Sequence, residues 1–469
     1  MSALAAARAH VRTIGFVSRL LPMFPSAPID WLTRAPVIES VTYQTRDGEV
    51  RAEVYRPPGR GPYPAVLMCL GVVPFGVDHP QIPRLKAALA RFGFVALIHW
   101  SPAMRDRRLV PEDIENTAAA YDYLVRRPDV NPATSGLFGT CVGGSFALLA
   151  AAHPSIRDRV AFVGAFAPYS SMWTFVRDIA SRTRSNGGSA ESWLVDPLTR
   201  DVFVRSVTDT LAPHEAERLR ADGSTDGEID PAELSGDGRA VYALLTARDR
   251  DAAELALQAL PQAMRRRLDA MSPLQHIGDI KAGLILVGHD RDDLVIPVGE
   301  SRRLASALRA RAGAKYTEYA MFQHADPTKR KLSPLRLIRE LRRFYLSLYP
   351  MFRQAVVHRV PEGELRSATG RLGLRHMVRR EEPLDGVHLP VGVHDADVRV
   401  PSGASIELGK DPEEVRQQDA VHAAVADDED GLSGALAGEA IDHAERPRED
   451  LIERLSARPR DETVVVPVR

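Results

Sequence analysis

One short stretch limits the fold of this chain more than any other. Gly139-Thr-Cys141-Val-Gly143 links an apolar run that ends at Phe138 to a second, small and apolar run over residues 146–152. The first run predicts a buried strand, and the second predicts a helix packed against it. A nucleophile at the tip of such a turn has a strained backbone, and its neighbours two residues away must be small because larger side chains would collide across the turn. The stretch therefore predicts a strand–nucleophile–helix turn with Cys141 at its tip.

The helix after this turn has a chemical consequence for Cys141. Its first amide groups point at the site, where they favour a thiolate and a developing oxyanion. The alternative is a packing turn that carries a buried, unreactive cysteine. Residues further along the chain favour the reactive interpretation, because they supply an acid and a histidine in a suitable order.

Strands and helices are predicted to alternate on both sides of this turn. Residues 41–45 and 50–55 alternate between polar and apolar around Asp47-Gly48, which predicts a hairpin. Apolar runs predict further strands, and helical periodicity lies between them. The strands are expected at 65–70, 94–98, 160–166, 282–287 and 315–322, and the helices at 83–91, 111–127, 298–312 and 334–349. This pattern predicts an α/β fold with a doubly wound, mostly parallel sheet.

The 469 residues divide into three predicted parts. Residues 1–36 are expected to form an amphipathic helix and a linker, and residues 37–352 the α/β domain. Residues 353–469 contain no Phe, Tyr or Trp, so this C-terminal extension is expected to be partly disordered. Within the domain, residues 171–273 have a helical pattern without a strong strand. They are expected to form a cap over the carboxyl ends of the strands.

Charge and cysteine content exclude several classes of function. Lys and Arg number 61 against 62 Asp and Glu, which argues against a nucleic-acid partner. Two cysteines cannot form a disulfide framework, and they favour a reducing, cytoplasmic location. Arginines interrupt the apolar residues of the N-terminal helix, so no integral membrane span is expected. Packing on the domain is the favoured role of this helix, and weak membrane-surface contact is the alternative. The oligomeric state stays open.

A cysteine nucleophile needs a base, and the base needs an orienting acid. The segment 288–297 offers three acids after a predicted strand, Asp290, Asp292 and Asp293. His324 directly follows the last predicted strand and is the favoured base. The rival histidines are His79, His99, His276 and His289. The backbone amides of Val142 and Val72 are the predicted donors to the oxyanion.

At these residues the chain resembles the α/β-hydrolase superfamily, and within it the enzymes similar to dienelactone hydrolase. Those enzymes carry Gly-x-Cys-x-Gly-Gly, matched here from Gly139 to Gly144, and the order nucleophile, acid, histidine. The ending Asp-Leu-Val-Ile-Pro of segment 288–297 is typical of the superfamily's acid region and favours Asp293. The resemblance covers about residues 37–349. It implies metal-free and cofactor-free hydrolysis of an ester, lactone or thioester through an acyl-cysteine, with Cys141, Asp293 and His324 as the triad.

Three alternatives accompany this interpretation. Acyl-CoA thioesterases and acyltransferases of the bile-acid-conjugating type use a cysteine in a similar turn, and a non-catalytic binding protein could keep the same fold. The compact dienelactone hydrolases lack so long a cap, so their substrate does not carry over.

Residues 222–233 also match the calcium loop of an EF-hand. Its exit helix would be broken at 235–238 and no second loop exists, so a polar loop without metal is favoured.

Overall fold

The computed structural model describes residues 3–25, 27–73, 79–186, 189–221, 229–324 and 332–357. The predictions for the C-terminal extension beyond residue 357, and for residues 222–228 of the calcium-like loop, lie outside the described residues. Two acids of that loop are described. The Asp230 side chain accepts a hydrogen bond from the Ala232 amide (2.9 Å), and Glu233 pairs with Arg218 (2.5 Å).

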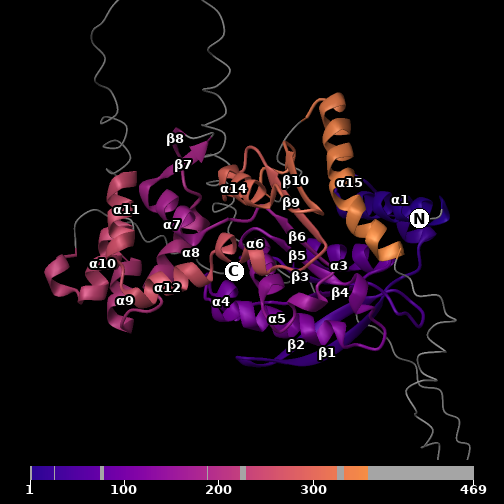
Figure 1. The fold of residues 1–469 in the computed structure, drawn as a ribbon, viewed down its shortest axis with the longest axis horizontal. Helices are drawn as coiled ribbons and strands as arrows, with labels where there is room; N and C mark the ends of the chain where they lie inside the picture. Colours follow the sequence, from indigo (N-terminus) through magenta and orange to yellow (C-terminus); the bar gives the residue numbers. More distant parts are fainter. Residues whose placement is uncertain are drawn as a thin grey trace, which may run out of the picture. The chain divides into compact units, whose positions relative to one another are not determined.

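Eight strands form one sheet in the order β1-β2-β4-β3-β5-β6-β9-β10 (Figure 1). Strand β1 pairs with β2, and β2 with β4, in antiparallel fashion, whereas all other neighbours are parallel. The predicted α/β class with a mostly parallel sheet is therefore confirmed. The strands are β1 Val37–Thr45, β2 Gly48–Arg56, β3 Ala65–Cys69, β4 Val95–Ile98, β5 Gly136–Thr140, β6 Phe162–Phe166, β9 Leu284–Asp290 and β10 Ala314–Tyr319.

Helices cover both faces of this sheet, which is why β3, β4, β6 and β9 are buried along their whole length. One face packs against α1 (Ala3–Leu20), α3 (Gln81–Arg91) and α15 (Pro334–Val357). The other face packs against α5 (Glu112–Val125), α6 (Val142–Ala152) and α14 (Val298–Leu308). Short helices complete this part of the fold: α2 Ala27–Leu32, α4 Pro102–Arg105 and α13 Pro273–His276, with 3-10 turns at Pro132–Thr134, Arg157–Arg159 and Ile277–Asp279.

The segment between β6 and α13 is mainly helical and gathers on one side of the sheet in Figure 1. Contrary to the sequence prediction, it also contains a small antiparallel pair, β7 Thr183–Asn186 and β8 Ser189–Ser192. Its two ends lie side by side, because the Leu274 amide donates to the Ser170 carbonyl (3.0 Å) and the Met172 amide to the Ser272 hydroxyl (2.9 Å). Its helices are α7 Met172–Ser181, α8 Pro197–Thr208, α9 Pro213–Ala221, α10 Gly236–Leu245, α11 Arg250–Ala259 and α12 Gln262–Ala270, with a 3-10 turn at Pro231–Glu233.

Two elements begin or end where the sequence pattern does not predict. Helix α6 starts at Val142, directly after Cys141, instead of at Phe146. Strand β9 continues to Asp290, so His289 and Asp290 belong to the buried strand and not to the loop after it. In the part of the chain that is described, no helix is long and apolar enough to cross a membrane.

Candidate active site

Cys141 occupies the turn between β5 and α6 with the backbone that the spacing predicts. Its φ is 56° and its ψ is −142°, a left-handed conformation that few non-glycine residues adopt. The Cys141 amide donates to the Phe166 carbonyl (2.8 Å), which ties the turn to the neighbouring strand β6. The flanking residues must be glycines because any side chain would clash with the backbone. A Cβ on Gly139 would lie 2.2 Å from the Gly143 carbonyl oxygen, and one on Gly143 would lie 2.2 Å from the Cys69 carbonyl oxygen. The side chain of Cys141 is partly exposed, and its thiol is free.

The loop after β3 lies directly against this turn. A Cβ on Gly71 would come within 2.9 Å of the Gly143 amide nitrogen, and the Thr140 hydroxyl donates to the Leu70 carbonyl (3.2 Å). Val72 and Val142 pack on the same apolar cluster as Cys141. Val142 is the first residue of α6, so its amide has no partner within the helix. The two residues predicted to supply the oxyanion donors therefore belong to segments that lie close to Cys141.

Asp293 belongs to the loop between β9 and α14, and its side chain is buried. One of its carboxylate oxygens, Oδ1, accepts from the amides of Val295 (2.8 Å) and Ile296 (3.0 Å). The other, Oδ2, faces His324 Nδ1 at 2.8 Å. Burial alone would raise the pKa of Asp293, but the charge of His324 and the hydrogen bonds from His289 and His324 outweigh it and lower that pKa. Asp293 is therefore held as a carboxylate.

His324 connects Asp293 to Cys141. Its Nδ1 lies 2.8 Å from Asp293 Oδ2, and the Cys141 side chain is close enough to act on the pKa of the His324 ring. Burial would lower the pKa of His324, but the charges of Asp293 and Cys141 and the hydrogen bond to Asp293 raise it well above its ordinary value. An imidazolium is thus stabilised between a carboxylate and a thiol. The structure thus brings together the three residues that the sequence predicts, Cys141, His324 and Asp293.

The other two candidate acids lie elsewhere. Asp290 is fully buried at the end of β9, where it accepts from the amides of Phe322 (2.6 Å) and Asp292 (3.0 Å). It thereby ties the loop that carries His324 to β9. Asp292 is on the surface. Neither has a hydrogen bond to His324 among those that the structure describes.

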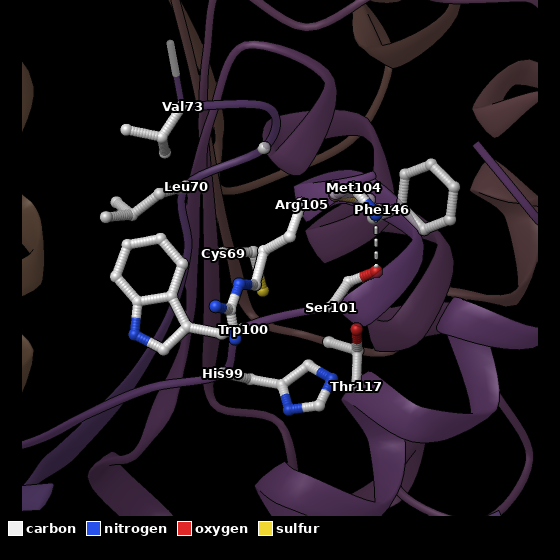
Figure 2. Close-up of a pocket in the computed structure, with 11 residues that line it drawn as sticks. Cys69, Leu70, Val73, His99, Trp100, Ser101, Met104, Arg105, Thr117 and Phe146 are labelled. Atoms are coloured by element: carbon white, nitrogen blue, oxygen red, sulfur yellow. Dashed lines mark hydrogen bonds between the residues drawn. The ribbon is translucent and has the colours of Figure 1, made fainter. Parts of the chain in front are cut away.

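A cavity of about 270 Å³ opens beside the loop after β3 (Figure 2). It runs from Cys69 and Gly71 to the segment after β4, where His99, Trp100, Ser101 and Arg105 line it. His99 is 6% exposed, and its Nδ1 lies 2.9 Å from the Tyr43 hydroxyl. Its Nε2 is buried without a hydrogen-bond partner among the described residues. Burial lowers the pKa of His99 to about 4, so the ring is neutral at pH 7.

Two other residues of this cavity have clear electrostatic properties. The guanidinium of Arg105 reaches over the cavity between Trp100 and Ser101 (Figure 2), and no hydrogen bond or ion pair of this group occurs within the described part of the chain. Burial, with the nearby charge of Asp113, raises the pKa of the second cysteine, Cys69, to about 12. Cys69 therefore stays a thiol at neutral pH, in contrast to what a nucleophile requires.

Sequence reasoning missed Arg105 as a candidate functional residue, and it predicted His99, at the sheet edge, as a residue that could contact substrate and not the nucleophile. A signal was available, because both follow β4 at the same sheet edge as Cys141, where parallel strands present their carboxyl ends. His289 was considered only as a rival base. It lies instead behind Asp293, with its Nε2 3.3 Å from Asp293 Oδ2.

Comparisons with known proteins give short matches. No family model matches the chain. Over 139 residues it is 28% identical to "Bile acid-CoA:amino acid N-acyltransferase" of Mus musculus, covering 27% of this chain and 32% of that protein. Over 138 residues it is 36% identical to "Probable 2-oxo-3-(5-oxofuran-2-ylidene)propanoate lactonase" of Bradyrhizobium sp, covering 25% of this chain and 53% of that protein. The matches thus span about a third and about half of the lengths of these two relatives.

Among solved structures, the 2,6-dihydroxy-pseudo-oxynicotine hydrolase aligns with 71% of this chain and 70% of its own, at 14% identity and a TM-score of 0.42. The strand order and the strand–nucleophile–helix turn described above are those of an α/β-hydrolase type of fold.

Proposed function

We propose that this chain is a dienelactone-hydrolase-like enzyme that cleaves a carboxylic ester, lactone or thioester through an acyl-cysteine. One observation carries the proposal: His324 is hydrogen-bonded to Asp293 and lies close enough to Cys141 for both residues to raise its pKa. A histidine held between a carboxylate and a thiol is the arrangement that activates a cysteine nucleophile. The names of the two relatives, an acyltransferase and a lactonase, support acyl chemistry at the coarser level.

The proposed reaction follows from this arrangement. His324 takes the proton of the Cys141 thiol. The sulfur attacks the carbonyl carbon, and the electron pair of the C=O bond moves to oxygen, which the Val142 and Val72 amides stabilise. When the tetrahedral intermediate collapses, the bond to the leaving group breaks and His324 gives that group its proton. His324 then takes a proton from water, which attacks the acyl-cysteine and releases the acid. Asp293 stays ionised and orients His324 throughout.

The cavity beside the loop after β3 adds a preference for one end of the substrate. Arg105 brings to its wall a positive charge that has no ion-pair partner among the described residues, and Trp100 and Phe146 bring apolar surface. A carboxylate or another planar anion matches a guanidinium in charge and shape. The proposed substrate is therefore an acyl compound that carries an anionic group near the scissile carbonyl.

The first test compares the wild type with Cys141→Ala on short and medium p-nitrophenyl esters. A burst of nitrophenol and a mass increase equal to one acyl group are expected for the wild type only. Cys69→Ala is the matched control, since it removes the other thiol, and it is expected to keep both the burst and the adduct. Hydrolysis at the wild-type rate by Cys141→Ala would overturn the proposal.

A second candidate function, transfer of the acyl group to an amine, is favoured by the match to an amino acid N-acyltransferase. Both functions share the acyl-cysteine and differ in what attacks it. Adding glycine or taurine to the assay separates them. Amide product formed in preference to the free acid would assign the transferase function.

A further inference from the structure

His289 is fully buried near the end of strand β9, where it lies against Asp293, the proposed triad acid. Its Nε2 lies 2.8 Å from the Ile296 carbonyl oxygen and 3.3 Å from Asp293 Oδ2. Its Nδ1 lies 2.6 Å from the Ser301 hydroxyl oxygen on α14. Every polar atom of this ring therefore has a partner, although the proposed reaction does not require a second histidine.

The partners determine where the protons of His289 lie. A carbonyl oxygen only accepts, so Nε2 must carry a hydrogen, which it donates to Ile296 O, and Asp293 Oδ2 lies 3.3 Å from the same nitrogen. In the neutral ring, Nδ1 accepts the Ser301 hydroxyl hydrogen. In a protonated ring, Nδ1 would donate to Ser301, whose own hydrogen would turn to the Pro168 carbonyl at 3.3 Å. In both cases Nε2 remains a donor toward Asp293.

This donor completes the set of hydrogen bonds around Asp293. Oδ1 is anchored by two loop amides, but both lie on one side of the carboxylate. A carboxylate held only there could pivot about its Cβ–Cγ bond and change the direction in which Oδ2 faces His324. His289 limits this freedom, because its Nε2 lies 3.3 Å from Oδ2, the oxygen that the two loop amides do not contact.

We propose that His289 is a positioning residue that, fixed by Ser301, holds Asp293 Oδ2 in line with His324 and so maintains the His324–Cys141 contact. The proposal rests on the proposed function for its turnover readout, but not for its thiol readout. It assigns two histidines of opposite roles to one carboxylate: His324 moves the proton, and His289 keeps the acceptor in place.

Two polar variants separate the two ends of the ring. In His289→Gln the side-chain amide reaches the position of Nε2 and keeps a donor to Asp293. In His289→Asn the shorter amide reaches only the position of Nδ1, near Ser301. We expect His289→Asn to lower kcat by about 10- to 100-fold with little change in KM, as loss of one hydrogen bond to a charged group implies. His289→Gln is expected to recover most of that loss.

The second readout is the rate of Cys141 alkylation by iodoacetamide, followed on the Cys141 peptide between pH 5 and 10. A well-oriented imidazolium promotes the thiolate at neutral pH, whereas thiols ionise without help at alkaline pH. Alkylation of His289→Asn should therefore be slower than that of wild type near pH 7 and equal to it near pH 10. His289→Gln should follow the wild-type profile.

The outcomes separate this inference from the proposed function. If no ester is hydrolysed but the alkylation profiles differ as described, the proposed function fails and the positioning role stands. If the three alkylation profiles coincide, or if both variants lose only thermal stability, the positioning role is overturned. Should His289→Asn not fold, Ser301→Ala replaces it. Ser301→Ala removes only the partner of Nδ1. We therefore expect it to slow Cys141 alkylation near pH 7 by less than the loss of the Nε2 donor would.

Discussion

At the scale of single residues, the cavity beside the loop after β3 combines a neutral and a charged group. His99 is buried and neutral, and it keeps one ring nitrogen without a partner in the described structure. Arg105 lies at the more exposed rim, where its charge costs little solvation. A ligand that satisfied both would bring its anionic end to Arg105 and a polar atom to His99 Nε2. Such a site selects by charge first and by hydrogen bonding second.

Replacing Arg105 tests this selection. We expect Arg105→Met to raise KM by about 10- to 100-fold for an ester that carries a free carboxylate, because a charge-assisted hydrogen bond is lost. KM for the matching uncharged methyl ester should change little. Arg107→Met is the control, since Arg107 is on the same segment but pairs with Asp201 (3.0 Å) outside the cavity. An equal rise in KM for both substrates would contradict the assignment.

The residues of the site differ in how far the sequence predicts them. The position of Cys141 follows from glycine spacing, because the turn imposes local contacts that only glycine satisfies. His99 and Arg105 reach the site through the order of strands, with β4 beside β3, and no local pattern encodes that neighbour relation. The preference for Asp293 over Asp290 rested on a resemblance. The physical reason, burial of Asp290 inside β9, needs the true end of that strand.

At the scale of elements, Glu300 joins α14 to the start of the inserted segment. This fully buried carboxylate accepts from the Ser170 amide (2.7 Å), from the Ser170 hydroxyl and from the Thr174 hydroxyl (2.9 Å), and it pairs with Arg303. Ser170 precedes α7, and Thr174 lies in its first turn. The start of the segment between β6 and α13 is therefore fixed to the helix that follows the Asp293 loop.

Removing this carboxylate should loosen the attachment. We expect Glu300→Ala to lower the free energy of unfolding by about 3 to 5 kcal/mol, because the change breaks a buried ion pair and leaves buried donors unpaired. Glu254→Ala is the matched control within the same segment: its ion pair with Arg177 is half exposed, and a change within about 1 kcal/mol is expected. Urea denaturation measures both. Equal losses for the two variants would show that Glu300 has no special role.

The sequence pattern does not predict β7, β8 or the first turn of α6, because the local propensity of their residues argues against these elements. Strands β7 and β8 are rich in Ser, with Thr183 as their one β-branched residue and no aromatic residue, so their pairing with each other and contacts such as that of Arg250 with Ser185 stabilise them. Helix α6 begins over Gly143 and Gly144, which have low helix propensity, because the turn geometry and tertiary contacts override that propensity.

At the scale of the whole described chain, helices from its two ends pack together over one face of the sheet. Phe16 of α1 lies 5.3 Å from Phe352 of α15, between ring centroids, and Phe352 meets Phe94 beside β4 edge-on at the same distance. Phe352 is fully buried. The sequence predicts that both helices are amphipathic, but not which residues are inside. Val11 and Ile14 are largely exposed, whereas Thr13 is buried.

Phe352 should therefore be important for the stability of the whole domain. We expect Phe352→Ala to lower the free energy of unfolding by about 3 to 5 kcal/mol, because it leaves a cavity between the rings of Phe16 and Phe94. Leu335→Ala, at the exposed start of the same helix, should change it by less than about 0.5 kcal/mol. Both values follow from urea unfolding of the full chain. A small effect of Phe352→Ala would mean that α15 is not part of the cooperative unit.

The closed stem of the inserted segment has a consequence for how this protein could diversify. Ser170 and Leu274, and likewise Met172 and Ser272, are hydrogen-bonded neighbours, so the chain leaves and re-enters the sheet region at one place. Everything between these two points can be lengthened, shortened or exchanged without altering the register of any strand in the eight-stranded sheet. A related chain could therefore acquire another substrate by exchanging this segment. Strands β5 and β9, which precede Cys141 and Asp293, would stay as they are.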